Sequence, residues 1–162
     1  MQESDAKDSL PPPHEIGVFV RSNRELRRAR NAIKRAGVQP VDLSDKIEIT
    51  PGRLSIGTMH LAKGLEFRTV AVMACDDEII PLQERIENVS DDADLEEVYD
   101  SERHLLYVAC TRARDNLLVT GVKPASEFLD DLLIGFSPSG ATLTGRVSQP
   151  NALQAQVVGG AV

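Results

Sequence analysis

The sequence predicts an α/β domain in which a mainly parallel sheet is flanked by helices. Short apolar runs with the composition of buried strands occur at residues 16–20, 54–56, 69–75 and 116–122. Segments with helical spacing of apolar residues lie at 23–36 and 101–113. The length of 162 residues suits one domain with a single core, and 41% of the residues are hydrophobic.

We expect three parts along the chain. Residues 1–15 are polar and contain three consecutive prolines, which predicts a flexible lead-in. Residues 16–134 hold all of the expected strands and helices and form the folded domain. Residues 135–162 are rich in Gly, Ser, Pro, Ala and Gln without periodicity, which predicts a disordered tail.

Charge and composition exclude several classes of protein. The net charge of −7 gives no overall basic character that would attract nucleic acid. No apolar run approaches the roughly 20 residues of a membrane-spanning helix, so we expect no membrane partner. Cys75 and Cys110 lie inside apolar runs and are expected to be reduced and buried, in a cytoplasmic protein. The three histidines are scattered, so a metal site is not predicted.

Two segments have strong local charge. Residues 21–35 contain seven Arg or Lys against one Glu, and an amphipathic helix with solvated basic faces explains most of them. Residues 84–102 contain nine acidic residues and one Arg. This composition predicts a flexible, solvated loop that runs into the start of the helix expected at 101–113.

Polar residues cluster directly after the strand expected at 54–56. They include donors suited to phosphate and a carboxylate suited to a sugar hydroxyl: Thr58, His60, Lys63, Gly64 and Glu66. Open α/β sheets bind ligands at the carboxyl ends of their strands. The cluster therefore points to a nucleotide or nucleic acid, although a solvated local ion pair between Lys63 and Glu66 is the simpler alternative.

The chain has no Walker A loop. Gly52 and Gly57 have the G-x-x-x-x-G spacing, but Thr58 and Met59 stand where Lys and Ser or Thr are needed. The residues between the two glycines also have strand composition.

Three strings resemble motifs of the UvrD/Rep/PcrA-type superfamily 1 DNA helicases, in the family's order. IGVFVRSN resembles motif IV, TMHLAKGLEF resembles motif V, and SERHLLYVACTRARDNLLVTG resembles motif VI. The resemblance covers roughly residues 16–133 and implies the second, C-terminal of the family's two motor domains. It implies a RecA-like three-layer fold, with ATP bound between the two motor domains.

The resemblance assigns three residues to ATP. Arg21 of motif IV and Arg112 of motif VI match arginine fingers that reach the γ-phosphate, where a guanidinium stabilises the charge of phosphoryl transfer. Glu66 of motif V matches a glutamate that accepts a hydrogen bond from the ribose. The alternative for Arg112 is an ion pair with acidic residues that precede its helix.

The resemblance assigns four more residues of motif V. Thr58 and His60 match positions that contact the DNA backbone. Lys63 and Gly64 would couple the DNA and ATP sites through a tight turn.

Two features depart from the family pattern. Val20 stands where the family often has an aromatic residue that stacks on adenine. Only 36 residues, 22–57, separate Arg21 from Thr58, too few for the accessory subdomain that other members insert there.

The resemblance implies the C-terminal motor domain of an ATP-dependent DNA helicase, of 3′ to 5′ polarity and with a role in DNA repair. Its partners would be single-stranded DNA and the N-terminal motor domain of the same parent protein. That domain would hold most of the Mg²⁺ that accompanies ATP. Because the chain has no Walker A loop, it should not hydrolyse ATP alone. The alternative is a non-catalytic nucleotide- or DNA-binding regulatory module that retains the fold.

Overall fold

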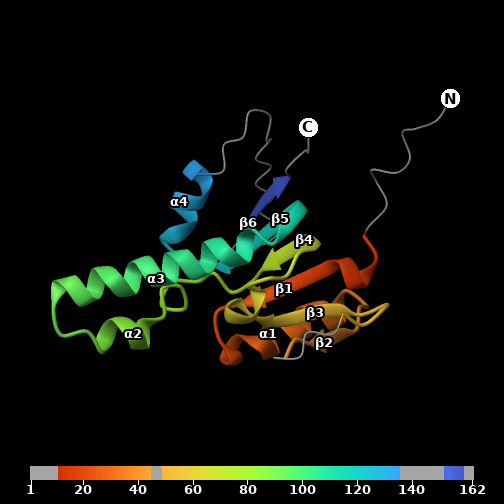
Figure 1. Ribbon diagram of the computed structural model, residues 1–162, viewed down its shortest axis with the longest axis horizontal. Helices are drawn as coiled ribbons and strands as arrows, with labels where there is room; N and C mark the ends of the chain where they lie inside the picture. Colours follow the sequence, from red (N-terminus) through yellow and green to blue (C-terminus); the bar gives the residue numbers. More distant parts are fainter. Residues whose placement is uncertain (1–10, 45–48, 136–151, 159–162) are drawn as a thin grey trace.

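The computed structural model describes residues 11–44, 49–135 and 152–158, and its centre is a six-stranded sheet (Figure 1). The strands lie in the order β2-β3-β1-β4-β5-β6. The first five are parallel to their neighbours, and β6 is antiparallel to β5. The mainly parallel α/β fold is thus confirmed. The strands are β1 Ile16–Val20, β2 Pro40–Asp42, β3 Leu54–Thr58, β4 Phe67–Val72, β5 Ala113–Val122 and β6 Ala152–Val158.

Helices on both faces of the sheet complete three layers (Figure 1). One face is covered by α1, and the other by α3 and α4. The short α2 packs beside α3. The helices are α1 Asn23–Arg35, α2 Gln83–Glu87, α3 Asp92–Cys110 and α4 Phe128–Gly135, with 3₁₀ helices η1 Pro13–Glu15 and η2 Met59–Ala62.

The side chains of β1 pack alternately against the helices on the two faces of the sheet. Successive strand residues point to opposite faces. Val18 and Val20 pack with Ile33 of α1, whereas Phe19 belongs to the cluster under α3. Phe19 meets Phe67 edge to face, with ring centroids 5.9 Å apart.

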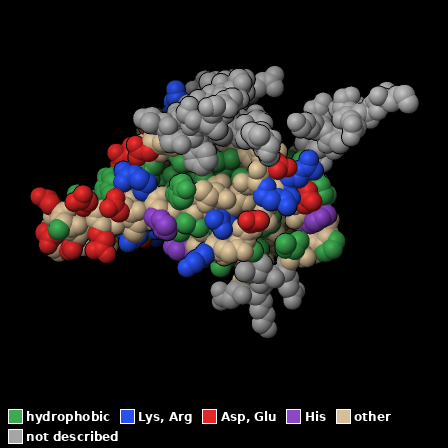
Figure 2. Space-filling view, turned by 45° about the horizontal axis from the view of Figure 1, so that its top comes forward, with side chains coloured by type: hydrophobic (Ala, Val, Ile, Leu, Met, Phe, Trp, Pro, Cys, Tyr) green, Lys and Arg blue, Asp and Glu red, His purple; other side chains and the backbone are tan. Residues whose placement is uncertain are grey.

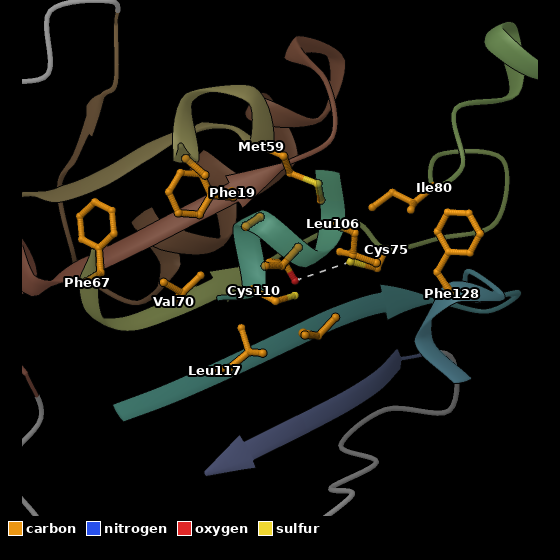
Figure 3. Packing of buried hydrophobic residues seen from close by; sticks show 14 of the residues in the cluster. Phe19, Met59, Phe67, Val70, Cys75, Ile80, Leu106, Cys110, Leu117 and Phe128 are labelled. Atoms are coloured by element: carbon orange, nitrogen blue, oxygen red, sulfur yellow. Dashed lines mark hydrogen bonds between the residues drawn. The ribbon is translucent and has the colours of Figure 1, made fainter. Parts of the chain in front are cut away.

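The larger core cluster lies between α3 and the middle of the sheet (Figure 3). Leu106 and Cys110 of α3 belong to this cluster together with Val70 of β4. Cys75 and Cys110 are free thiols and are buried, as expected. Burial raises the pKa of both, that of Cys110 to about 12, so they act as small hydrophobic residues.

The prediction of a flexible loop in the acidic segment is wrong. Its residues form α2 and the first half of α3, which begins at Asp92 rather than near Ser101. The Asp91 side chain caps α3 by accepting a hydrogen bond from the Asp94 amide at 2.9 Å. Asp92 and Asp94 lie in the first turn of α3, and Glu84 in that of α2, where the helix dipole favours negative charge. Farther along, Tyr99 packs against the core.

The two ends of the chain differ from expectation where the structure describes them. Residues 13–15 of the expected lead-in form η1, and residues 152–158 of the expected disordered tail form β6. Gly135, the first residue of the expected tail, ends α4, and residues 1–10, 136–151 and 159–162 lie outside the described residues. Within the described ranges, no helix is both long and apolar enough to cross a bilayer.

Gly121 permits close contact between β5 and the chain after β4. A Cβ at this position would lie 2.5 Å from the Cys75 carbonyl oxygen. The Cys75 backbone cannot easily move, because its N–H donates to Thr120 and its carbonyl accepts from the Ser126 amide. We therefore expect Gly121→Ala to lower the free energy of unfolding by about 3 kcal/mol.

Chemical denaturation of both variants tests this, with Gly52→Ala as the matched control. Gly52 has φ +74 and an open site for a Cβ. Its substitution should cost about 1 kcal/mol through backbone strain alone. A loss for Gly121→Ala no larger than that for Gly52→Ala would contradict the close-contact explanation.

Candidate functional site

The predicted site residues lie at two opposite ends of the sheet. Register pairs Val20 with Thr58, so Arg21 and Thr58 are neighbours where β1 and β3 end. Register also pairs Phe67 with Ala113, so Glu66 and Arg112 are neighbours where β4 and β5 begin. We call these the carboxyl-end group (Arg21, Thr58, His60, Arg85 and Glu102) and the amino-end group (Glu66 and Arg112).

A buried glutamate organises the carboxyl-end group. Glu102 Oε2 accepts hydrogen bonds from Arg21 Nε at 2.6 Å and from the Leu82 amide at 3.2 Å. Glu102 Oε1 accepts from Arg21 Nη2 at 2.5 Å and from Arg85 Nη1 at 2.7 Å. Arg21 and Glu102 are only 5% and 1% exposed. The pair is thus a desolvated, two-bond ion pair of the strong type.

The electrostatics agree with this geometry. Burial alone would raise the pKa of Glu102, but hydrogen bonds and charge from Arg21 and Arg85 outweigh it and hold the pKa below its ordinary value. The pKa of His60 is lowered, first by partial burial and then by the charge of Arg21. His60 is therefore neutral at pH 7 and lies within the field of this cluster.

Arg112 in the amino-end group makes only uncharged contacts. Its Nε donates to the Val108 carbonyl at 3.1 Å, its Nη1 to the Leu65 carbonyl at 3.5 Å, and its Nη2 to Thr111 Oγ1 at 3.3 Å. No ion pair of Arg112 occurs within the described ranges. The alternative of an ion pair with acidic residues is thus not what the structure shows.

Glu66 lies beside Arg112 and is exposed. Its two chain neighbours both contact Arg112, because Leu65 accepts from the guanidinium and the Phe67 amide donates to the Arg112 carbonyl at 2.9 Å. Among the residues that the structure describes, it therefore brings together a carboxylate without an ion-pair partner and a guanidinium without a carboxylate partner.

Lys63 and Gly64 lie in the connection that joins the two ends of the sheet. This connection leaves β3 through η2, which packs on α3, and returns to the start of β4. Both residues are exposed, and Gly64 has φ +81, a conformation that favours glycine. The predicted tight turn is therefore present.

The structure does not bring Arg21 and Arg112 together. Phe19 of β1 pairs with Val72 of β4, and Arg21 lies two residues past Phe19, toward the carboxyl end of the sheet. Ala113 of β5 pairs with Phe67 of β4, and Arg112 lies one residue before Ala113, toward the amino end. Val72 and Phe67 alone are separated by roughly 16 Å along β4, at about 3.3 Å per residue. The two guanidinium groups have separate partners.

Two members of the carboxyl-end group were missed by the sequence analysis. The sequence places both Glu102 and Arg85 only within the acidic segment 84–102. Arg85 offered one indication, since it is the single base among nine acids in residues 84–102. The role of Glu102 depends on the position of Arg21, 81 residues away.

Comparisons with known proteins identify the family of the chain. The family model of the UvrD-like helicase C-terminal domain matches residues 30–123. The ATP-dependent DNA helicase PcrA of Staphylococcus epidermidis is 39% identical over 71 residues, which are 44% of this chain and 9% of that protein. The ATP-dependent DNA helicase Rep of Buchnera aphidicola is 38% identical over 73 residues, or 45% of this chain and 10% of that protein.

A solved structure is also similar. It is the C-terminal domain of a possible DNA helicase from Lactobacillus plantarum, with 27% identity, a TM-score of 0.48 and coverage of 71% of this chain and 60% of that one. The chain spans about a tenth of the length of the curated relatives it matches. Because the family model covers more than half of the chain, the family is established. This chain belongs to the family of UvrD-like helicase C-terminal domains.

Proposed function

We propose that the chain is the C-terminal motor domain of an ATP-dependent DNA helicase or translocase, of 3′ to 5′ polarity. It would act with an N-terminal motor domain of the same protein and move along single-stranded DNA. The main support is the placement of two polar groups at opposite ends of one sheet, joined by the exposed Lys63-Gly64 connection. Such a connection suits the transmission of a nucleotide-dependent change to DNA.

Glu66 and Arg112 are the proposed nucleotide contacts. Glu66 would accept a hydrogen bond from the ribose, and Arg112 would stabilise the charge that develops on the transferred phosphoryl group. The absence of a carboxylate partner on Arg112, within the described part of the chain, supports this assignment because its charge is not neutralised. Arg21 is the other predicted finger, but it lies at the opposite end of the sheet and is bound to Glu102, so of these two arginines we assign the phosphoryl contact to Arg112.

Mg²⁺ would enter with ATP. Nowhere in the described ranges is a group of three or more His, Cys, Asp or Glu side chains arranged to hold a metal ion. We therefore assign the Mg²⁺ ligands mainly to the N-terminal motor domain.

Thr58 and His60 are the proposed DNA contacts. Thr58 is the last residue of β3, and His60 lies two residues farther on and is exposed. A neutral imidazole and a hydroxyl can each donate a hydrogen bond to a phosphate oxygen. Contacts of this kind position the protein on DNA without reading its sequence.

A second candidate function is a non-catalytic nucleotide- or DNA-binding regulatory module. The pairing of Arg21 with Glu102 favours it, because a buried guanidinium with a carboxylate partner is not available to a nucleotide. A strand-displacement assay distinguishes the helicase from the regulatory module. It uses the full-length product of the reading frame that encodes the chain. A helicase should unwind a duplex with a 3′ tail when ATP is present, and a regulatory module should unwind neither a 3′-tailed nor a 5′-tailed duplex.

The isolated 162-residue chain is expected to show no DNA-stimulated ATP hydrolysis. Residues 52–57 form a turn and β3 rather than a phosphate-binding loop, so no loop here cradles the β- and γ-phosphates. Phosphate release with and without oligothymidylate measures this. Turnover typical of a helicase, abolished by Arg112→Ala in the same chain, would contradict it.

A further inference from the structure

Arg85 of α2 has unused hydrogen-bonding capacity beside the proposed DNA contacts. Its side chain is 42% exposed. Its Nη1 donates to Glu102 Oε1 at 2.7 Å and to Ser101 Oγ at 3.0 Å. In the described part of the chain, its Nε and Nη2 have no hydrogen-bond partner. A guanidinium held at one nitrogen thus presents its remaining donors to solvent.

Glu102 fixes Arg85 without neutralising the cluster. Two arginines share this single buried carboxylate, so the three side chains together carry a charge of +1. The carboxylate accepts from three nitrogens of these arginines and from the Leu82 amide. An incoming anion would therefore meet a net positive and rigidly anchored group.

Arg85 lies at the same end of the sheet as the proposed DNA contacts. Arg85 and Arg21 bind the same carboxylate, and Arg21 is adjacent to Thr58 by register. The charge of Arg85 also contributes to the lowered pKa of His60. On the face in Figure 2, acidic side chains crowd the projecting end formed by α2 and the start of α3, and basic and histidine side chains lie beyond it.

We propose that Arg85 binds a phosphate group and that Glu102 is its positioning residue. The free Nε and Nη2 form the planar edge that pairs with two phosphate oxygens. The identity of the molecule that carries this phosphate depends on the proposed function. A phosphodiester of single-stranded DNA and the terminal phosphate of ATP share this chemistry, and they are distinguished below.

The first arm measures DNA binding by the 162-residue chain. The probe is a fluorescein-labelled 20-nucleotide oligothymidylate, followed by anisotropy over a series of KCl concentrations. Arg85→Ala should weaken binding about tenfold, as expected for loss of a hydrogen bond to a charged group. The slope of log K against log [KCl] should become shallower by about 0.7, the value for one phosphate contact on a single strand.

The matched control is Arg103→Ala. Arg103 lies on α3, is 46% exposed, and also binds carboxylates, those of Asp100 and Asp131. Its removal changes the net charge equally, so affinity for the oligonucleotide should stay within about twofold of wild type if location matters. Equal losses for the two variants would overturn the proposal in favour of a general charge effect.

The second arm uses a fluorescent ATP analogue with the same proteins. If Arg85→Ala weakens binding of the ATP analogue but not of the oligothymidylate, this would support the phosphate site and assign its ligand as the nucleotide. No loss with either probe would overturn the proposal. Failure of the wild-type chain to bind either probe would also overturn the phosphate-site proposal. Strand displacement by the full-length product tests the proposed function separately.

Glu102→Gln tests the positioning role. This change makes the cluster more positive, so a purely electrostatic effect would strengthen binding of both probes. If Glu102 instead positions Arg85, Glu102→Gln should bind the probes more weakly, while circular dichroism shows that the variant is folded. Stronger binding by the folded variant would overturn the role of Glu102, and Arg85→Ala decides the phosphate site even if Glu102→Gln does not fold.

Discussion

Replacing Arg112 with Ala in the full-length product is expected to lower ATP turnover by roughly 10³–10⁵-fold, the value of an arginine finger. Nucleotide affinity should change much less, because the finger acts mainly on charge that develops in the transition state. Arg112→Lys should not restore turnover, since an ammonium cannot reproduce the two-pronged guanidinium. Steady-state hydrolysis and equilibrium titration with a fluorescent ATP analogue measure the two quantities.

Arg114→Ala is the matched control for Arg112. Arg114 is two residues away and exposed at the start of β5, and its loss should leave turnover nearly unchanged. Melting temperatures show whether either substitution acts through folding. Near-normal turnover of a folded Arg112→Ala protein would remove Arg112 from the nucleotide site.

Glu102→Ala is expected to lower the free energy of unfolding by about 3–5 kcal/mol. The substitution leaves Arg21, which is 5% exposed, without the carboxylate that pairs with its guanidinium. A buried charge without a partner is costly, and the Leu82 amide also loses its acceptor. Urea denaturation of the 162-residue chain measures the change, and a loss below about 1 kcal/mol would contradict the buried-pair interpretation.

The control for Glu102→Ala is Glu97→Ala, also on α3 but exposed. Its effect on the free energy of unfolding should lie within about 0.5 kcal/mol of zero.

The same pair makes stability depend on pH. The pKa of Glu102 is lower in the folded state than its ordinary value of 4.5. Stabilisation by the ionised carboxylate is therefore complete above pH 4.5 and is lost as pH falls below it toward the folded-state pKa. The stability difference between wild type and Glu102→Ala should shrink over that range. A difference that stays constant there would contradict the lowered pKa.

The strands were predictable where apolar composition alone determines them. The expected strand at residues 16–20 coincides with β1, because nearly every one of these side chains is buried between two helical layers. The acidic segment was not predictable in this way. Its charges suggested disorder, but the Asp91 cap, the acids Asp92 and Asp94 in the first turn, and the packing of Tyr99 against Phe128 stabilise helix α3.

The candidate site was predictable only in part. Adjacent motif residues indicated that Thr58 and His60 follow one strand and that Glu66 precedes the next; in the structure His60 follows β3 and Glu66 precedes β4, whereas Thr58 is the last residue of β3. The pairing of Arg21 with Glu102 was not predictable, because it depends on α3 crossing the sheet to the end of β1. The partners of Arg112 are backbone carbonyls and a hydroxyl, which residue types do not specify.

ATP hydrolysis by the full-length product, measured with and without single-stranded DNA, tests the proposed motor function most directly. We predict hydrolysis that DNA stimulates, with the stimulated rate lost in Arg112→Ala while that variant still binds oligothymidylate with wild-type affinity. Binding of both ATP and DNA without any stimulated hydrolysis would contradict the motor assignment and favour the regulatory module.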